Sequence, residues 1–497
     1  MNDRSAIVAS GDPLTSDTAI QIMKQGGNAY DAIIAAGFVS VIAEPTLTSL
    51  GGGGFLLART ADGYAKIFDF FSNTPGKGHS AEALEPHFFP VTIHFANSDQ
   101  DFNIGLGSIA VPGNLKGFLH VHKKLGLLPL KEVLAPAIDA ARSGVRLGRD
   151  QADFIKLLKP IMTLTERGTQ LYSQDGEYFT YGDILRNPDL ANFLSELCHD
   201  EEHSFYHGAL ADRIEQEMQN GQGLLTKEDL ESYQVIEREP LATLYRGRRF
   251  LTNPPPSFGG ALIIDALHYL ETYDLPTVGP FSPEFIHAHA AVMMEIENSR
   301  IHGGQENKTP KARVFTRGTT HISVIDREGN AAAMTTSNGE GSGYIIPDSG
   351  IMLNNMMGED DLHPEGFHSA PPGERVSSMM SPSLLLENNE VALVIGSGGS
   401  KRIRTAITQV LSRIIDCGME AQEAVESPRI HWDGEVFQVE PGLSDNAVEV
   451  IAQSGPLKLA AVKNVYFGGV HTVVPGKSGG ADPRRGGAVR SYSFAKP

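Results

Sequence analysis

The sequence has 497 residues, of which 41% are hydrophobic and 20% are charged, as is typical of a globular protein with a large core. Its formal net charge of -19 at pH 7 excludes an electrostatic basis for binding nucleic acid or an anionic membrane, because both carry negative charge. Only two cysteines occur, Cys198 and Cys417, which excludes a disulfide framework and a cysteine-rich metal site. We therefore expect a small-molecule substrate and no metal or organic cofactor.

The chain shows no sequence signal for a membrane or for secretion. No apolar run reaches the roughly 20 residues needed to span a bilayer. The first ten residues, MNDRSAIVAS, contain no apolar signal segment. We expect a cytoplasmic protein.

The first part of the chain is typical of two helices followed by a strand. Ser16 is a candidate N-cap for a helix that ends at the glycine pair 26–27, and a second helix is predicted over 29–43. The four glycines at 51–54 then lead into a short apolar strand over 55–58. A phosphate-binding loop needs a strand before its glycines and a helix after them. This tetraglycine has the reverse order, so it predicts close backbone packing instead.

The centre of the chain, about 115–220, has the apolar spacing of helices, and further helices are predicted over 261–270 and 283–299. We find no catalytic motif in the segment 115–220. A polar stretch over 303–318 is typical of an exposed linker.

Strands are predicted after this linker. Two extended runs, 320–326 and 331–338, flank a Glu-Gly-Asn turn and predict a β-hairpin. Further strands are expected over 383–386 and 391–395, followed by a helix over 403–416.

The register of the hairpin brings polar residues together at its open end. A symmetric turn centred between residues 328 and 329 would place Thr319 opposite Asn338. The same register would place Thr320 opposite Ser337. We therefore expect Ser337 to lie within reach of the first residues of the hairpin.

The junction between linker and hairpin, Gly318-Thr319-Thr320-His321, is the strongest candidate for chemistry. A threonine hydroxyl is a weak nucleophile unless a base is adjacent, and a chain-terminal α-amino group, with a pKa of about 7.7–8, supplies that base. Cleavage of the bond between Gly318 and Thr319 would create both groups at once. Thr319 is thus a candidate nucleophile and base, with Ser337 orienting it. Alternatively, the threonines here reflect only β-propensity.

Two other segments have alternative interpretations. The turn Gly396-Ser397-Gly398-Gly399-Ser400 precedes a predicted helix, so its backbone N–H groups could stabilise an oxyanion, although many strand-to-helix connections are rich in Gly and Ser. The Pro- and Gly-rich segment 361–373 is either an exposed loop or a flap over an active site.

Together these segments resemble the γ-glutamyltransferase family, which belongs to the N-terminal nucleophile (Ntn) hydrolases. The resemblance runs from near residue 7 to the carboxy terminus. Its markers are QGGNAYDA at 25–32, GGGGF at 51–55, AVPG at 110–113, NPPPS at 253–257, TTH at 319–321, SSM at 377–379 with SP at 381–382, and ADPRRGG at 481–487.

The resemblance implies an α+β fold, a four-layer αββα sandwich, formed as one intertwined domain from two processed segments. The large segment would be 1–318 and the small segment 319–497, and the two would pair after cleavage. A dimer of such pairs is an alternative assembly.

The resemblance also implies roles for individual residues. An acyl-enzyme would form on Thr319, and the oxyanion hole would fall on Gly398 and Gly399. Ser337 occupies the place where the family usually has a threonine that holds the nucleophile. Ser377 and Ser378 match serines that contact the substrate carboxylate.

The chain departs from the family pattern at the substrate. Members that bind a γ-glutamyl group carry an arginine in a motif like D-F-R-E, and Phe71 stands where this arginine would be. Members usually read N-N-Q-M-x-D after the hairpin, whereas this chain has Met356 in place of the glutamine and Glu359 near the place of the acid. Asn338 matches an amine-binding asparagine across a one-residue gap. These changes disfavour a γ-glutamyl substrate.

We therefore expect a self-processing amidohydrolase that transfers an acyl group from Thr319 to water or to an amine. Its substrate would be a small amide or a γ-glutamyl compound. The alternatives are a true glutathione hydrolase or γ-glutamyl transpeptidase with altered carboxylate recognition, an enzyme like cephalosporin acylases or oxamate amidohydrolases, and a processed but inactive binding protein.

Overall fold

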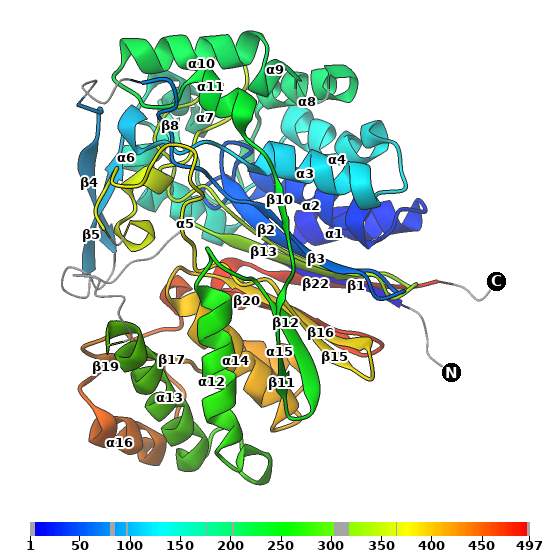
Figure 1. Ribbon diagram of the computed structural model, residues 1–497, viewed down its shortest axis with the longest axis vertical. Coiled ribbons are helices and arrows are strands. Elements are labelled where there is room, and N and C mark those ends of the chain that lie inside the picture. The colour runs from blue at the N-terminus through cyan, green and yellow to red at the C-terminus, as the bar shows by residue number, and fades with distance from the viewer. Residues whose placement is uncertain are drawn as a thin grey trace.

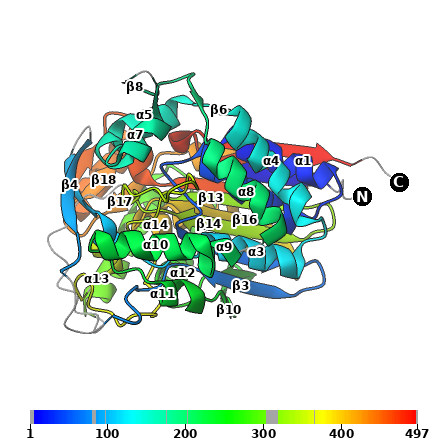
Figure 2. The same cartoon turned by 90° about the horizontal axis from the view of Figure 1, so that it is seen from above.

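Two β-sheets stack face to face between two layers of helices in the computed structural model (Figures 1 and 2). The structure describes residues 5–79, 85–95, 98–174, 176–200, 203–302, 318–363 and 365–494. The expected αββα sandwich is confirmed. The expected linker lies outside the described residues, except for Gly318.

Seven strands form the sheet beneath the amino-terminal helices, in the order β10-β3-β2-β14-β13-β1-β22. All neighbouring pairs are antiparallel. The strands are β1 (Ser5–Ser10), β2 (Gly53–Arg59), β3 (Ala65–Phe70), β10 (Ile236–Arg238), β13 (Thr320–Ile325), β14 (Ala331–Ser337) and β22 (Ala488–Ser493).

Six strands form the second sheet, in the order β11-β12-β15-β16-β20-β21. They are β11 (Leu241–Tyr245), β12 (Arg248–Thr252), β15 (Ser383–Glu387), β16 (Glu390–Gly398), β20 (Gly469–Val474) and β21 (Ser478–Ala481). Both sheets combine strands from before and after residue 318. A cut at that residue would therefore leave two segments that still share both sheets.

Helices cover both outer faces. The first sheet is covered by α1 (Pro13–Lys24), α2 (Ala29–Ala43) and α3 (Asn114–Leu125), with α4 (Leu130–Ser143) packed on α2. The second sheet is covered by α12 (Gly259–Glu271), α14 (Arg402–Ile415) and α15 (Ala421–Glu426), with α13 (Pro283–His302) packed on α12 and α16 (Asp445–Ser454) packed on α13. No helix in the described part of the chain is both long and apolar enough to cross a membrane.

Shorter elements extend this frame. The remaining helices are α5 (Arg149–Leu157), α6 (Lys159–Met162), α7 (Glu166–Tyr172), α8 (Pro188–Asp200), α9 (His203–Tyr206), α10 (Ala209–Asn220) and α11 (Lys227–Ser232). The remaining strands are β4 (Phe89–Phe95), β5 (Ser98–Ile104), β6 (Val145–Arg146), β7 (Ser173–Gln174), β8 (Glu177–Tyr178), β9 (Ile184–Leu185), β17 (Ile430–Trp432), β18 (Phe437–Val439) and β19 (Leu457–Leu459).

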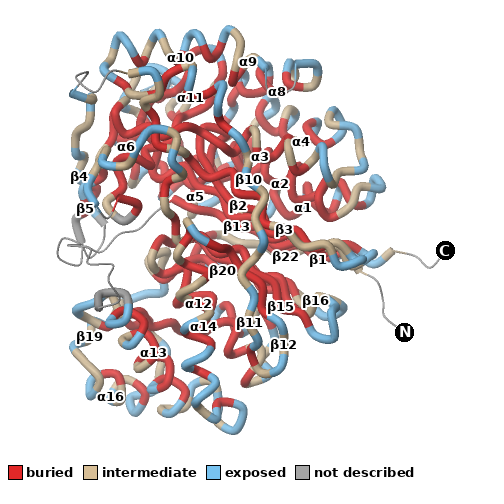
Figure 3. Tube along the Cα trace, viewed as in Figure 1, coloured by how far each residue is buried: buried red, intermediate tan, exposed pale blue. Residues whose placement is uncertain are grey.

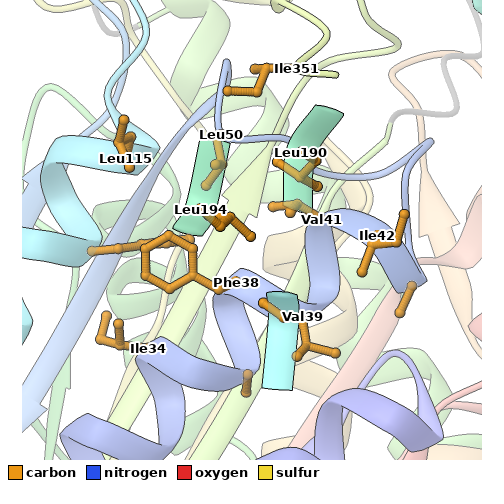
Figure 4. Close-up of a cluster of buried hydrophobic side chains, with 14 of the residues drawn as sticks. Ile34, Phe38, Val39, Val41, Ile42, Leu50, Leu115, Leu190, Leu194 and Ile351 are labelled. Atoms are coloured by element: carbon orange, nitrogen blue, oxygen red, sulfur yellow. The ribbon is translucent and has the colours of Figure 1, made fainter. Parts of the chain in front are cut away.

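Helix α2 forms at the residues that its sequence predicts. Asn28 caps it by accepting from the N–H groups of Tyr30 and Asp31, and Asp31 accepts in return from the Asn28 N–H. Every residue of α2 is buried, because the helix lies between the first sheet and helices α4 and α8 (Figures 3 and 4). A helix that is apolar all round is stable only in such a place.

Helix α1 begins earlier than predicted. Asp12 is its N-cap and accepts from the Leu14 N–H at 2.7 Å, and Pro13 occupies the first helical position, where a proline is favoured. The predicted cap, Ser16, is instead a buried residue inside the helix. Its hydroxyl bonds to Ser10 at 2.6 Å and to the Ala488 carbonyl at 2.8 Å, so it ties α1 to β1 and β22.

The hairpin β13–β14 forms as predicted, but its register differs by one residue. Thr320 pairs with Thr336, so this register continues with Thr319 opposite Ser337. The loop has five residues, 326–330, instead of the symmetric four expected. Asp326 sets this length, because its N–H bonds to the Asn330 carbonyl and its carboxylate accepts from the N–H groups of residues 328 and 330.

Both faces of β13 are buried, so its side chains contact the core on each side of the first sheet. Ile322 and Val324 join the core under the amino-terminal helices, whereas Ile325 joins the core between the sheets. The His321 ring also faces the second sheet, where a Cβ atom at Gly396 would lie only 2.2 Å from it. Hydrogen bonds to Thr335 at 2.7 Å and Ser323 at 3.0 Å hold this ring in place.

We predict that Gly396→Ala destabilises the protein by about 1–3 kcal/mol, because the added methyl group forces the two sheets apart. The measurement is the midpoint of urea unfolding. Gly279→Ala is the matched control, since a Cβ atom at Gly279 meets nothing within 4 Å. Equal midpoints for the two variants would contradict this account of how the sheets pack.

Candidate active site

A pocket opens where β13 begins and where β14 and β16 end. It encloses ≈ 350 Å³, including space open to solvent. Its lining residues are Phe71, Thr319, Ser337, Met356, Glu359, Leu362, Ser378, Met379, Met380, Ser400 and Ile403. Six of these residues are candidates from the sequence, although they lie as much as 307 positions apart in the chain, counted from residue 71 to residue 378. The fold therefore brings most of the predicted site residues to one place.

The peptide bond between Gly318 and Thr319 lies beside this pocket, and hydrogen bonds hold both sides of it. The Gly318 N–H donates to the carboxylate of Glu340 at 3.2 Å, and the Gly318 carbonyl accepts from the Ser337 hydroxyl at 2.5 Å. The Ser337 oxygen in turn accepts from the Gly339 N–H at 2.9 Å. The Gly318 carbonyl is therefore polarised by a hydroxyl whose own position is fixed.

Residue 318 has no room for a side chain. A Cβ atom there would lie 2.3 Å from the Gly339 carbonyl oxygen and 2.5 Å from that of Thr46. The chain immediately before Thr319 is thus enclosed between the loop that follows α2 and the turn that follows β14.

Arg485 holds the other side of Thr319. Its Nη1 donates to the Thr319 carbonyl at 3.0 Å, from the 3₁₀ helix η6 (Pro483–Arg485). Burial lowers the pKa of this guanidinium to about 10, with neighbouring Arg402 acting in the same direction, so the side chain remains a cation at neutral pH. Arg485 lies within a motif that identified the family resemblance, but nothing in the sequence assigned it a role.

Gly398 lies against the candidate nucleophile, and Gly399 follows it at the end of β16. A Cβ atom at Gly398 would be 2.2 Å from the Thr319 carbonyl oxygen and 3.3 Å from the Thr319 Cβ. Gly399 has φ of +122°, which favours glycine, and its carbonyl accepts from the Arg402 N–H at the start of α14. Their role in stabilising an oxyanion stays a prediction.

Glu44, like Glu340, is an acidic residue at the site that no motif in the sequence marked. It follows α2, is fully buried, and accepts from the Thr320 hydroxyl at 2.6 Å and the Thr15 hydroxyl at 3.5 Å. Burial raises the pKa of Glu44 to about 8, and nearby Asp12 adds to this rise, whereas the Thr320 hydrogen bond and Arg485 oppose it. A neutral carboxyl group therefore anchors the residue directly after Thr319.

Phe71 follows β3 and forms a rigid wall of the pocket. Its ring stacks on Phe55 with 5.4 Å between centroids and 16° between planes. Its N–H donates to the Asp69 carboxylate at 3.0 Å, and its carbonyl accepts from the Tyr233 hydroxyl at 2.7 Å and from Arg375. The main chain of Phe71 is thus held from both sides.

The segment 361–373 contributes to the pocket through one of its ends. Leu362 is a lining residue, and its carbonyl accepts from the Ser377 hydroxyl at 2.8 Å. The buried His363 bonds through Nε2 to the Met356 carbonyl at 2.9 Å, next to the lining residue Met356. The start of this segment therefore packs against the pocket wall, and the flap over an active site stays a prediction.

Four candidates from the sequence do not line the pocket, namely Ser377, Asn338, Gly398 and Gly399. Ser377 directs its hydroxyl to Leu362, whereas its neighbour Ser378 does line the pocket. Asn338 is buried behind Ser337, and its main chain bonds to Leu47, Gly341 and Asn355. Direct substrate contacts by Ser377 and Asn338 remain predictions.

The tetraglycine packs against the hairpin, as its sequence predicted. Cβ atoms at Gly52 and Gly54 would lie 2.1 Å and 2.5 Å from the carbonyl oxygens of Ser337 and Thr335. Side chains at these positions would push β14 away from β2 and shift Ser337. Among the described residues, no group of three or more His, Cys, Asp and Glu side chains is arranged to hold a metal ion.

Comparisons with known proteins show which family the chain resembles over most of its length. The family model described as gamma-glutamyltranspeptidase matches residues 15–316 and 289–492. The glutathione hydrolase proenzyme of Escherichia coli (strain K12) is 30% identical over an alignment that covers 97% of this chain and 90% of the relative. The acylase ACY 1 proenzyme of Pseudomonas sp. (strain SE83) is also 30% identical, with 90% of this chain and 86% of the relative covered.

Solved structures show the same fold. The cephalosporin acylase from Bacillus halodurans superposes with a TM-score of 0.81 at 24% identity, covering 99% of this chain and 96% of that one. At this level of identity the likeness concerns the fold alone.

The raised pKa of Glu44 predicts a pH-dependent stability difference. Between an ordinary carboxyl pKa of about 4.5 and the folded value of about 8, the folded state keeps a proton that the unfolded state releases. The contribution of Glu44 to the free energy of unfolding therefore falls as the pH rises through that window. Since Glu44→Gln cannot ionise, we expect its melting temperature, relative to that of the native protein, to rise from pH 5 to pH 8 and then to level off.

Glu390→Gln is the control for this measurement, because Glu390 is exposed at the start of β16. Its melting temperature is expected to follow that of the native protein at every pH. A difference between Glu44→Gln and the native protein that stays constant from pH 5 to pH 8 would contradict the neutral state of Glu44.

Proposed function

The chain belongs to the γ-glutamyltranspeptidase family of self-processing Ntn amidohydrolases, and from that premise we propose that Thr319 is its nucleophile. The observation that carries this proposal is the arrangement around the bond between Gly318 and Thr319. Its carbonyl accepts from Ser337, its flanking groups are held by Glu340 and Arg485, and a pocket lies beside it.

Self-cleavage follows from this arrangement as an acyl shift. The Thr319 hydroxyl attacks the Gly318 carbonyl carbon, the C–N bond breaks, and the nitrogen takes up a proton to become the α-amino group of Thr319. The resulting ester is hydrolysed by water, which frees the carboxylate of Gly318. The Ser337 hydroxyl stabilises the negative charge that develops on the Gly318 oxygen.

The mature reaction uses the same groups on an external amide. The α-amino group of Thr319 accepts the hydroxyl proton while the oxygen attacks the substrate carbonyl. The N–H groups of Gly398 and Gly399 stabilise the oxyanion, the amine leaves with a proton, and an acyl group remains on Thr319. Water or an acceptor amine then removes the acyl group.

The two products of self-cleavage are 1–318 and 319–497, and they remain paired. The first sheet joins β13, β14 and β22 of the small segment to four strands of the large segment, and the second sheet joins β11 and β12 to four strands of the small segment. Separation would expose both interfaces to water.

The pocket favours an amide other than a γ-glutamyl compound. The E. coli relative is named a glutathione hydrolase and the Pseudomonas relative an acylase, so the family includes both kinds of name. Phe71, which lines the pocket, offers no partner for the α-carboxylate of a γ-glutamyl group. The acylase-like alternative therefore agrees better with the lining residues.

We predict that Thr319→Ala abolishes self-cleavage and that Ser337→Ala slows it by about 100-fold or more, because one removes the nucleophile and the other removes an oxyanion donor. Ser337→Thr keeps the hydroxyl and is the matched control. The measurement is intact mass against time after expression. The native chain should give two fragments, 1–318 and 319–497, whose masses place the cut between residues 318 and 319.

Two outcomes would contradict this proposal. The first is a native chain that stays whole under conditions where it is folded. The second is cleavage of Thr319→Ala at the same bond and at the native rate.

A further inference from the structure

The walls of the pocket at Thr319 are apolar. Phe71, Met356, Leu362, Met379, Met380 and Ile403 supply hydrocarbon and thioether surface, and the polar lining residues are three serines, Thr319 and Glu359. Among the described residues that line the pocket, none is a lysine, an arginine or a histidine. Apolar walls with a few polar groups are typical of sites that bind an apolar ligand in a fixed orientation.

The arginine that donates to the Phe71 carbonyl, Arg375, is held by several partners outside the pocket. Arg375 donates to the carbonyls of Phe71 and Gln234 and to the Tyr233 hydroxyl, and its Nε lies 3.2 Å from the Asp69 carboxylate. Arg238 binds the other oxygen of Asp69 at 2.8 Å. Turning Arg375 toward the pocket would leave the buried Asp69 carboxylate with one cation fewer, which is costly.

The wall itself cannot move aside to admit a cation. The Phe71 side chain is 1% exposed, its ring is stacked on Phe55, and its main chain is bonded on both sides. The methionines, in contrast, are flexible and fill space of irregular shape. The pocket thus combines one rigid aromatic wall with an adaptable one.

The acyl half of the substrate is the part that must match these walls. It occupies the site in both half-reactions, because the first bonds it to Thr319 and the second releases it, whereas the amine leaves and water enters from solvent. A carboxylate on that acyl group would be desolvated without a cationic partner and would lie near the acidic Glu359, and both effects oppose its binding.

We infer that the enzyme acts on amides of apolar monocarboxylic acids, whose acyl chain carries no carboxylate and packs against Phe71 and the methionines. This inference rests on the proposed function, because it assigns the substrate class of the same site. The space at the pocket is ≈ 350 Å³ even with the part open to solvent included, so the acyl chain that fits beside Thr319 is short.

The test compares two substrates that differ only at the end of the acyl chain. Self-cleaved native enzyme is given hexanoyl p-nitroanilide and adipoyl mono-p-nitroanilide, which has a carboxylate in place of the terminal methyl group. We expect kcat/KM for the hexanoyl compound to exceed that for the adipoyl compound by about 100-fold, as a desolvated carboxylate requires. γ-Glutamyl p-nitroanilide should also be a poor substrate.

Two variants address the wall directly. Phe71→Arg should raise kcat/KM for the adipoyl compound relative to the hexanoyl compound, because a guanidinium then faces the carboxylate. Phe71→Leu, the uncharged control, should keep the order found for the native enzyme. If Phe71→Arg fails to fold or to cut itself, the kcat/KM values of the native enzyme for the hexanoyl and adipoyl compounds still test the inferred substrate class.

Equal or greater activity of the native enzyme on the adipoyl or γ-glutamyl compound would overturn the inferred substrate class. A self-cleaved enzyme that turns over none of the three compounds would overturn it as well. In both cases the mass of the two fragments would still support Thr319 as the site of cleavage. Absence of self-cleavage would instead overturn the proposed function.

Discussion

The bond between Gly318 and Thr319 is held by hydrogen bonds from three other parts of the chain. Ser337 ends β14 and Glu340 follows it, whereas Arg485 lies near the carboxy terminus. Glu44, just after α2, accepts from the hydroxyl of Thr320, the next residue. Because each group is buried, none can be lost without leaving another polar group without its partner. The surrounding elements must therefore keep this geometry.

Close packing of the backbone makes this arrangement possible. Gly52, Gly54, Gly396 and Gly398 all lie where a Cβ atom would come within 2.5 Å of neighbouring atoms. These contacts let β2, β14 and β16 approach the start of β13 more closely than side chains would allow. The tetraglycine at 51–54 thus allows close backbone packing beside the site.

The pocket and the bond between Gly318 and Thr319 have different chemical characters. The bond is surrounded by a hydroxyl, a carboxylate and a guanidinium, whereas most of the pocket wall is hydrocarbon and thioether. Thr319 lies at the border between them. In the proposed function, the polar side would support chemistry on a carbonyl group, and the apolar side would contact the acyl chain of the substrate.

The sequence by itself determined the elements whose signals are local. The largely apolar stretch 29–43 predicted α2 at its observed bounds, and two extended runs around a Gly-Asn turn predicted β13 and β14. The family resemblance that ordered motifs carry implied the αββα fold and six of the eleven residues that line the pocket.

Only the tertiary structure decided how distant residues meet. The register of the hairpin depended on hydrogen bonds of Asp326 that lengthen the loop, so Ser337 rather than Asn338 lies opposite Thr319. Glu44 and Arg485 converge on the start of β13 because α2 and η6 pack there, and no local pattern in the sequence encodes that approach. Burial then set the ionisation of Glu44, since desolvation is a property of the folded surroundings.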